Sequence, residues 1–382
     1  MLYHLCYWLT KGNTNYFYGS VWWRAIAAVL VAFVIVWALG PRVIRKLVQL
    51  KIGDRPEFDH AALNRMMQGK ENTPTMGGIL IVVAVAVTVL LLANLTDFYV
   101  TLGLFCLVWL AVLGGIDDWL KLTANRRAGT RDGLRMWEKL IFQVALGVML
   151  ALFIYRFGEL NVEKARWLDV AAQYRPNYKF LNIPFCKYPV TTLSVPVFAL
   201  IAVVVIAGTS NAVNLTDGMD GLASGCMVLT SFAFMVLAII IGDEKLAGGL
   251  GFRDIEGAGE LGVLCGAVLG ACLGFLWYNA YPAQVFMGDT GALPLGGLMG
   301  YVAIVTRLEP WLLIVGGVFV IEAVSVLLQI FHYKTTGRRL FRCAPLHHHY
   351  HLGGLSETQV VMRFWLLASV FAALALATIK LR

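Results

Sequence analysis

The residues of this sequence that are best suited to chemistry are aspartates. Asp117 and Asp118 are adjacent, Asp217 and Asp220 are three residues apart, and Asp289 stands within Phe-Met-Gly-Asp-Thr-Gly. Mg²⁺ is usually held by one or two carboxylates together with substrate phosphates and water. Asp289 together with the other acids could build such a site, which is typical of metal-assisted chemistry on a phosphate. Asp289 alone is equally explained as a helix N-cap.

The adjacent pair cannot point both carboxylates at one ligand. Neighbouring side chains on a helix diverge by about 100°. We therefore expect one of Asp117 and Asp118 to face the site and the other to support it. Two close carboxylates repel, and a cation or Lys121, one turn later, would relieve that repulsion. The alternative is a solvated, charged end of an apolar segment.

A polar stripe surrounds the second pair. The spacing of three between Asp217 and Asp220 predicts one helical face, and Asn211 and Asn214 precede them at the same spacing. Such a stripe would line a hydrophilic groove, while Gly218 permits close backbone approach. A capped transition from loop to helix would account for one of these residues.

Four histidines, His347, His348, His349 and His351, lie close together near the C-terminus. A run of histidines can indicate zinc or nickel, but consecutive residues rarely converge on one metal, and neither CxxC nor HExxH accompanies them. We expect a loop that contacts anions, transfers protons or hydrogen-bonds to phosphate.

Other polar residues adjoin apolar segments. Thr73 can cap a helix, and Pro74 suits the first position of that helix. Lys70 and Lys139 could place point charges on a phosphate. Glu322 lies deep in an apolar run, where an ionisable group should face the protein interior or a water-filled cleft. It could be structural or part of the site.

Apolar segments must position these residues. Of the 382 residues, 59% are hydrophobic and 14% are charged, and the mean hydropathy is +0.72. A soluble domain carries about a quarter charged residues. Runs of about 20 apolar residues can cross a bilayer as helices. We predict an all-α integral membrane protein, a single domain over 1–382 with about ten such helices: 20–40, 76–94, 98–116, 137–157, 193–210, 221–241, 260–277, 291–306, 311–333 and 361–380.

Charge bias orients this bundle. The loops after the first, third and ninth runs hold seven, five and four Lys or Arg residues, whereas the even-numbered loops together hold eight. The positive-inside rule places the odd loops in the cytoplasm and both termini in the periplasm. Because the chemistry-bearing segments fall in or beside the odd loops, we expect an active-site cleft on the cytoplasmic face. The net charge of +8 then reflects contact with anionic lipid rather than with nucleic acid.

Five ordered motifs resemble those of one enzyme family. TPTMGG, GGIDDWLK, NAVNLTDGMDGLA, PAQVFMGDTG and PLHHH are similar to those of the phospho-N-acetylmuramoyl-pentapeptide transferases, in the superfamily of polyprenyl-phosphate N-acetylhexosamine-1-phosphate transferases. The likeness extends from about residue 40 to the C-terminus. It implies transfer of phospho-MurNAc-pentapeptide from UDP-MurNAc-pentapeptide to undecaprenyl phosphate, giving lipid I and UMP. It also implies Mg²⁺ as cofactor, a homodimer, and the bacterial inner membrane.

The resemblance also assigns roles. It implies catalytic roles for Asp117, as the base for the lipid phosphate, and for Asp118, Asp289 and His348, with Asp289 binding Mg²⁺. A rival mechanism makes Asp289 a nucleophile. Phe286 would stack on uracil. The implied substrate-binding residues are Lys70, Thr75, Lys121, Asn211, Asn214, Asp217, Gly218, Met219, Asp220, Asn279, Phe286, Gln329, His347 and His349.

The chain departs from the family pattern at Ala292, where Ser is usual, at His351, in the longer stretch 122–139 and in the extended loop 158–192. We expect this loop to form a small external hairpin or helix. Two other functions fit the sequence less well. One is transfer from UDP-GlcNAc by the same chemistry. The other is secondary transport, which usually shows internal repeats and a site at the bilayer midplane; no repeat is visible here.

Overall fold

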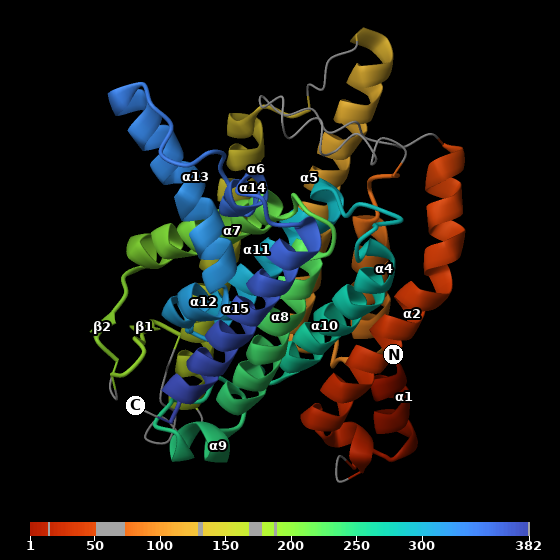
Figure 1. Cartoon of the computed structure of the whole chain (residues 1–382). Coiled ribbons are helices and arrows are strands. Elements are labelled where there is room, and N and C mark those ends of the chain that lie inside the picture. The colour runs from red at the N-terminus through yellow and green to blue at the C-terminus, as the bar shows by residue number, and fades with distance from the viewer. Residues whose placement is uncertain (14–15, 51–72, 129–132, 168–177, 187–188, 381–382) are drawn as a thin grey trace.

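The computed structural model describes residues 1–13, 16–50, 73–128, 133–167, 178–186 and 189–380, which form a helical bundle (Figure 1). A short hairpin, in which Phe180 pairs with Thr192, supplies the strands of the described residues. A hairpin is one of the two forms expected within 158–192, and this pairing confirms it. The elements in chain order are α1 Leu2–Leu9, η1 Phe17–Gly19, α2 Val21–Gln49, α4 Gly78–Leu92, α5 Phe98–Ala128, α6 Met136–Trp167, β1 Phe180–Leu181, β2 Thr191–Thr192, α7 Val195–Thr216, α8 Leu222–Ile241, α9 Glu244–Gly249, α10 Glu260–Asn279, α11 Asp289–Val305, α12 Glu309–Val315, α13 Gly317–Thr336, α14 Leu346–Leu352 and α15 Glu357–Thr378.

Eight helices of the described residues are long and apolar enough to cross a membrane, namely α2, α5, α6, α7, α8, α10, α13 and α15. Two further apolar helices, α4 and α11, are shorter, with 15 and 17 residues. Each of the ten predicted apolar runs is thus helical, and the all-α membrane architecture is confirmed.

The prediction of one continuous helix over 311–333 is wrong. The chain breaks between α12 and α13 at Gly316, whose backbone N–H still bonds to the carbonyl of Leu312. Beyond this break α13 diverges from the bundle (Figure 1). Its outer face is apolar, with Leu327 65% and Phe331 70% exposed. An apolar helix that leaves the protein core in this way is suited to contact with lipid.

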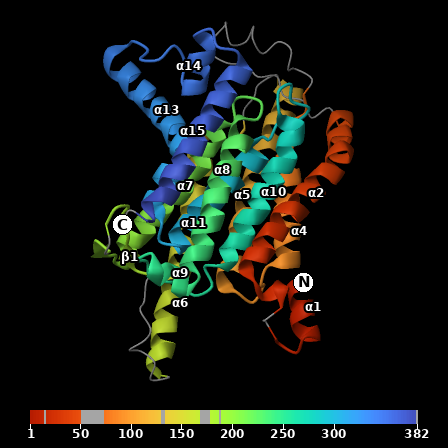
Figure 2. The same cartoon turned by 60° about the horizontal axis from the view of Figure 1, so that its bottom comes forward.

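Helix α11 forms the centre of the bundle, and every one of its residues is buried. It packs mainly against α5 and α7, while α10 packs against α2 and α8. Figure 2 shows α10 side by side with α2 and α8. Small residues let these helices approach closely, as is usual where lipid supplies no hydrophobic drive for association.

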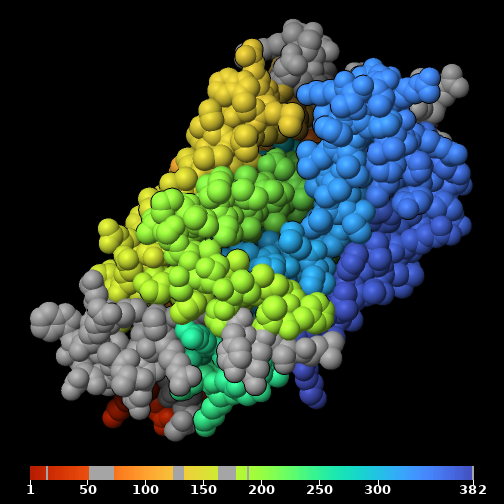
Figure 3. Space-filling view, turned by 90° about the vertical axis from the view of Figure 1, so that its left-hand side faces the viewer, coloured from red at the N-terminus to blue at the C-terminus, as the bar shows by residue number. Residues whose placement is uncertain are grey.

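The histidine-bearing helix α14 lies at the end of the bundle away from both termini (Figures 1 and 2). From the side, α6, α7 and α13 form one face (Figure 3). Near the opposite end, Arg24 of α2 makes two hydrogen bonds of 2.6 and 2.5 Å to the Glu260 carboxylate of α10. Glu260 also accepts from the backbone N–H of Asn94 at 2.9 Å. This buried ion pair therefore ties α2, α10 and the end of α4 together.

Gly114 of α5 sets the closest approach of α5 to α11. A Cβ at Gly114 would overlap the carbonyl group of Asp289, whereas a Cβ at Gly208 in α7 would meet nothing within 4 Å. We predict that Gly114→Ala lowers the thermal unfolding temperature and displaces Asp289.

The matched control is Gly208→Ala. Ala is favoured over Gly in a helix interior by about 1 kcal/mol, so Gly208→Ala should leave the protein as stable as before or slightly more so. Equal unfolding temperatures for the two variants would contradict the close approach. Both are measured on the purified protein in detergent.

Candidate active site

The first acidic pair lies within α5 rather than after it. The predicted helix ended at residue 116, but α5 continues to Ala128, so Asp117 and Asp118 both project from helix. They are 0% and 4% exposed, so the alternative of a solvated helix end is wrong. Burial of two charges requires nearby partners.

Asp118 uses both carboxylate oxygens to hold the start of α11. Its Oδ1 accepts from the backbone N–H of Asp289 at 3.1 Å. Its Oδ2 accepts from the backbone N–H of Thr290 at 2.9 Å and from the Thr290 hydroxyl at 2.7 Å. A carboxylate at this place satisfies N–H groups that have no partner within the helix and is favoured by the helix dipole. Asp118 therefore supports the site, and its neighbour faces it.

Two lysines join Asp117 to Asp289. Nζ of Lys139 on α6 lies 2.7 Å from Asp117 Oδ2 and 2.6 Å from Asp289 Oδ2. Nζ of Lys121 lies 2.7 Å from Asp117 Oδ2 and 3.3 Å from Asp289 Oδ1. The remaining oxygen of Asp117 accepts from the backbone N–H of Leu134 at 2.7 Å. Three helices thus meet at one cluster of alternating charge.

This cluster could hold a cation. Asp117, Asp118 and Asp289 each offer an oxygen atom within 4.8 Å of the others. Two ammonium groups face three carboxylates, which leaves one negative charge in excess if all are ionised. Carboxylate oxygens are the ligands that Mg²⁺ prefers. Asp289 is not an N-cap, because Gly288 occupies that position and Asp289 is the first residue of α11. The side chain of Asp289 is therefore free of capping and directed at the lysines.

The segment before α4 reaches the same place. Phe286 N–H bonds to the Pro74 carbonyl, and Gly77 and Gly78 N–H bond to the carbonyls of Phe286 and Met287, at 2.8 to 2.9 Å. This pairing holds Thr75 against Gly288, where a Cβ would lie 3.0 Å from the Thr75 hydroxyl. The expectation that Thr73 caps the helix is wrong, because α4 begins at Gly78 with Gly77 as N-cap. The chain before it instead pairs, through its backbone, with the segment that contains Phe286 and Met287.

Asp217 and Asp220 do not share a helical face, so the predicted stripe of four is wrong. Helix α7 ends at Thr216 and residues 217–221 form a turn. Asp217 accepts from the backbone N–H of Gly288, next to Asp289. Burial, together with the charges of Asp289 and Asp118, raises the pKa of Asp217 to about 7. Asp220 turns the other way, where its Oδ2 accepts from Ala283 N–H at 3.0 Å and its own N–H bonds to Glu357 at 2.9 Å.

The histidines occupy a helix, so the prediction of a loop is wrong. His347 and His348 of α14 are buried, and both lie against Gly218, where any Cβ would overlap Nε2 of His347. Glu322 of α13 accepts from the His347 backbone N–H at 3.2 Å and approaches its Nδ1 at 3.1 Å. That contact places a proton on Nδ1, and Nε2 is directed at the Gly218 turn without a hydrogen-bond partner among the described residues. Glu322 is thus a supporting residue of α14.

Other predicted binding residues hold loops in place. The amide oxygen of Asn279 accepts from Gly221 N–H and from the Ser224 hydroxyl. Its Nδ2 donates to the Val285 carbonyl. Gln329 binds the backbone of Leu340 and Phe341, and His349 Nδ1 accepts from Arg342 N–H. These side chains therefore position the loops that border the site. Lys70 lies outside the described residues.

The amide of Asn211 is also committed to packing. Its Nδ2 donates to Gln143 Oε1 at 2.7 Å, while Gln143 donates to the Ser210 hydroxyl at 3.1 Å and Ser210 donates to the Leu293 carbonyl at 3.0 Å. This network joins α6, α7 and α11 below the charged cluster. Asn214, shortly before the 217–221 turn, is partly exposed, and Met219 within this turn is buried. Phe286, shortly before α11, is partly exposed.

The sequence analysis did not identify four residues whose hydrogen bonds hold the site together, namely Gln143, Ser210, Thr290 and Glu357. A signal was present for Gln143, because it stands four residues after Lys139 and shares its helical face. The bonds of Thr290 and Glu357 join residues distant in the sequence. At the departures from the family pattern, Ala292 is buried in α11 and His351 Nδ1 lies 2.9 Å from the Leu355 carbonyl.

Comparisons with known proteins give the class of the chain. A model described as glycosyl transferase family 4 matches residues 100–307, which is more than half of the chain, so the chain is a glycosyl transferase of this class with membrane-spanning helices. A signature of phospho-N-acetylmuramoyl-pentapeptide-transferase matches residues 70–82. Curated proteins of that name from Citrifermentans bemidjiense, Desulfosudis oleivorans and Syntrophus aciditrophicus are 39%, 41% and 41% identical, and the alignments cover 100% of both chains. The chain belongs to the phospho-N-acetylmuramoyl-pentapeptide-transferase family.

We predict that Glu322→Leu destabilises the protein, because two buried N–H groups of His347 lose their acceptor. Each such loss costs about 1–3 kcal/mol, so the free energy of unfolding should fall by about 2 kcal/mol or more. Val324→Ala, on the exposed side of α13 (44% exposed), is the control and should change little. Chemical unfolding that shows the same small effect for both variants would contradict the role of Glu322.

The raised pKa of Asp217, about 7, predicts a pH-dependent stability. The folded protein holds the Asp217 proton more tightly than the unfolded chain, whose carboxyl has a pKa of about 3.9. The stability linked to this group is therefore present below pH 4 and is lost as the pH rises to about 7. Asp217→Asn should match the wild type more closely at pH 5 and exceed its unfolding temperature at pH 8. A difference that is constant over this range would contradict the assignment.

Proposed function

We propose that the chain transfers phospho-MurNAc-pentapeptide from UDP-MurNAc-pentapeptide to undecaprenyl phosphate, giving lipid I and UMP. The full-length likeness to transferases of that name supports this reaction. The observation that carries it in the structure is the joint hold of Lys121 and Lys139 on Asp117 and Asp289. Such a cluster can place cations and carboxylates around two phosphate groups.

In this reaction an oxygen of undecaprenyl phosphate attacks the phosphorus that bears the sugar. The bond from that phosphorus to the oxygen shared with the uridine phosphate breaks, and UMP leaves with both bonding electrons. Phosphoryl transfer depends mainly on positioning and charge neutralisation. We assign Lys121 and Lys139 to the phosphates and Asp117 to the proton of the lipid phosphate. Asp118 keeps α11 in register, and this arrangement favours direct transfer over attack by Asp289.

We also propose that Asp289 holds Mg²⁺ with help from Asp117. The excess negative charge and the close oxygen atoms of the cluster fit this ion. Bound there, Mg²⁺ would neutralise phosphate charge. Asp217, Gly218 and His347 lie on the neighbouring turn and helix, where they are placed to receive the nucleotide, with His348 beside them.

The site would face the cytoplasm of the bacterial inner membrane, with both termini in the periplasm and the chain as a homodimer. Charge bias of the loops supports the orientation. A cytoplasmic site also suits the substrates, because a soluble nucleotide and a lipid phosphate meet at that surface. The homodimer rests on the family likeness alone.

Release of UMP by the purified protein tests the function. With Mg²⁺ and undecaprenyl phosphate, we expect UMP from UDP-MurNAc-pentapeptide, loss of turnover with EDTA, and recovery when Mg²⁺ is added back. Asp289→Asn should reduce turnover by about 100-fold or more, as the loss of a charge-stabilising group does elsewhere.

Glu244→Gln, which removes an exposed charge on α9 at a distance from the cluster and the 217–221 turn, is the control and should retain most turnover. UMP release from UDP-GlcNAc but not from UDP-MurNAc-pentapeptide would replace the proposed substrate. Substrate flux into proteoliposomes without UMP would instead indicate a transporter.

A further inference from the structure

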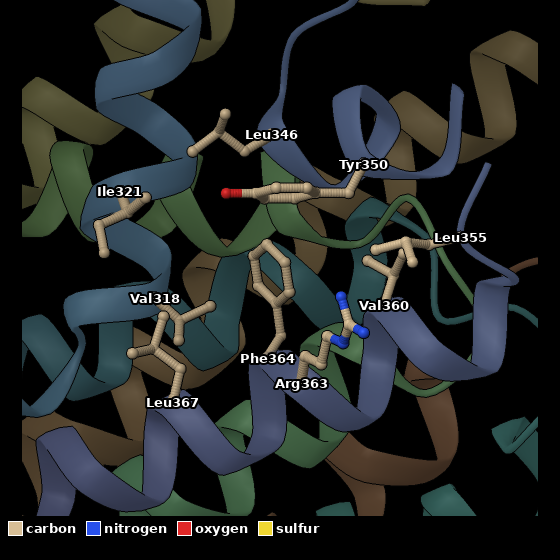
Figure 4. Close-up of a pocket in the computed structure, with 9 residues that line it drawn as sticks. All are labelled: Val318, Ile321, Leu346, Tyr350, Leu355, Val360, Arg363, Phe364 and Leu367. Carbon is tan, nitrogen blue, oxygen red and sulfur yellow. The ribbon is translucent and has the colours of Figure 1, made fainter. Parts of the chain in front are cut away.

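A cavity lies beside α14, where Leu346 and Tyr350 line it (Figure 4). It has a volume of about 410 Å³ and is bounded by α13, α14 and α15. A volume of this size is typical of small-molecule pockets. No residue of α5, α6 or α11 lines it, so it is separate from the acids and lysines of the active site.

The cavity is apolar except at two positions. Its walls are aliphatic or aromatic, including Val318 of α13 and Phe364 of α15, and its polar lining residues are Tyr350 and Arg363. Tyr350 packs edge-on near Phe364, with ring centroids 6.2 Å apart. Tyr350 is 45% exposed and Leu367 is 37% exposed, so the cavity opens to the surface of the bundle.

Arg363 is the charged residue of this cavity. It is exposed, and the described residues offer it no ion-pair or hydrogen-bond partner. No Asp, Glu, Lys or Arg follows it until Lys380. Arg363 therefore stands where the apolar part of α15 begins, which is the depth at which lipid phosphates lie.

The positions of the polar and apolar lining residues along the cavity match an amphiphilic ligand. Tyr350 and Arg363 stand toward the site end, while Val318 and Leu367 stand one turn or more deeper along their helices. A positive charge above an apolar cavity complements a negative head above a hydrocarbon chain. The absence of a lining carboxylate disfavours a cationic head.

We propose that this cavity binds one acyl chain of an anionic phospholipid, whose phosphate is held by Arg363 and Tyr350. Leu346 and Tyr350 form one face of α14, four residues apart, and His347 and His348 lie beside them. A bound lipid therefore fills the space behind the histidine helix and stabilises its contact with Gly218. This site is distinct from the proposed site of chemistry and does not depend on the proposed reaction.

Titration of delipidated full-length protein in neutral detergent tests the proposal. Phosphatidylglycerol should raise the unfolding temperature of the wild type, whereas phosphatidylcholine should raise it much less. Arg363→Gln should weaken the apparent affinity for phosphatidylglycerol about tenfold, the loss expected for one charge-assisted hydrogen bond. Arg339→Gln, which changes an exposed arginine outside the cavity, should leave the affinity as it was.

A second variant separates the cavity from general attraction of charge. Leu367→Trp keeps Arg363 but fills the opening, and it should also abolish the shift, with fewer phosphatidylglycerol molecules retained in native mass spectrometry. Equal affinity for phosphatidylglycerol in the wild type, Arg363→Gln and Leu367→Trp would overturn the proposal. So would a shift produced by undecaprenyl phosphate alone and lost in the same two variants.

Discussion

The burial of three carboxylates at the meeting point of α5, α6 and α11 is the constraint on which the rest of the structure depends. Isolated charges cannot be buried at acceptable cost, so each needs partners with good geometry. Lys121 and Lys139 supply opposite charge, and Asp118 instead takes the N–H groups at the start of α11. The same interactions that make burial possible also bring three distant helices to one point.

Close helix packing maintains this arrangement. Gly114 permits the contact of α5 with Asp289, and the amide of Gln143 links α6 to α7 and, through Ser210, to α11. A hydrogen bond between helices in an apolar surrounding has few competitors, although its net contribution is modest. Small residues and a short polar network therefore place the lysine of α6 within reach of two acids.

The part of the site around the Gly218 turn is held together by different interactions. The Gly218 turn, α14 and α13 are joined by close contacts and by Glu322, and this packing positions the histidines. Since α14 has only seven residues, it has little stability of its own. Both of its faces depend on neighbours: His347 and His348 lie against the Gly218 turn, and Tyr350 packs near Phe364 of α15.

The sequence by itself determined the class of protein, the apolar helices and the motifs that carry the chemistry. Hydropathy reports helix existence well because a bilayer demands long apolar segments. Local spacing misled at Asp217 and Asp220, because the end of α7 sets a turn that periodicity does not show. It also missed the break at Gly316 and the helical state of the histidines. Only the tertiary structure decided which acid faces the lysines and that Glu322 supports His347. These contacts join residues up to 172 positions apart, as in Asp118 with Thr290, and no local pattern encodes them.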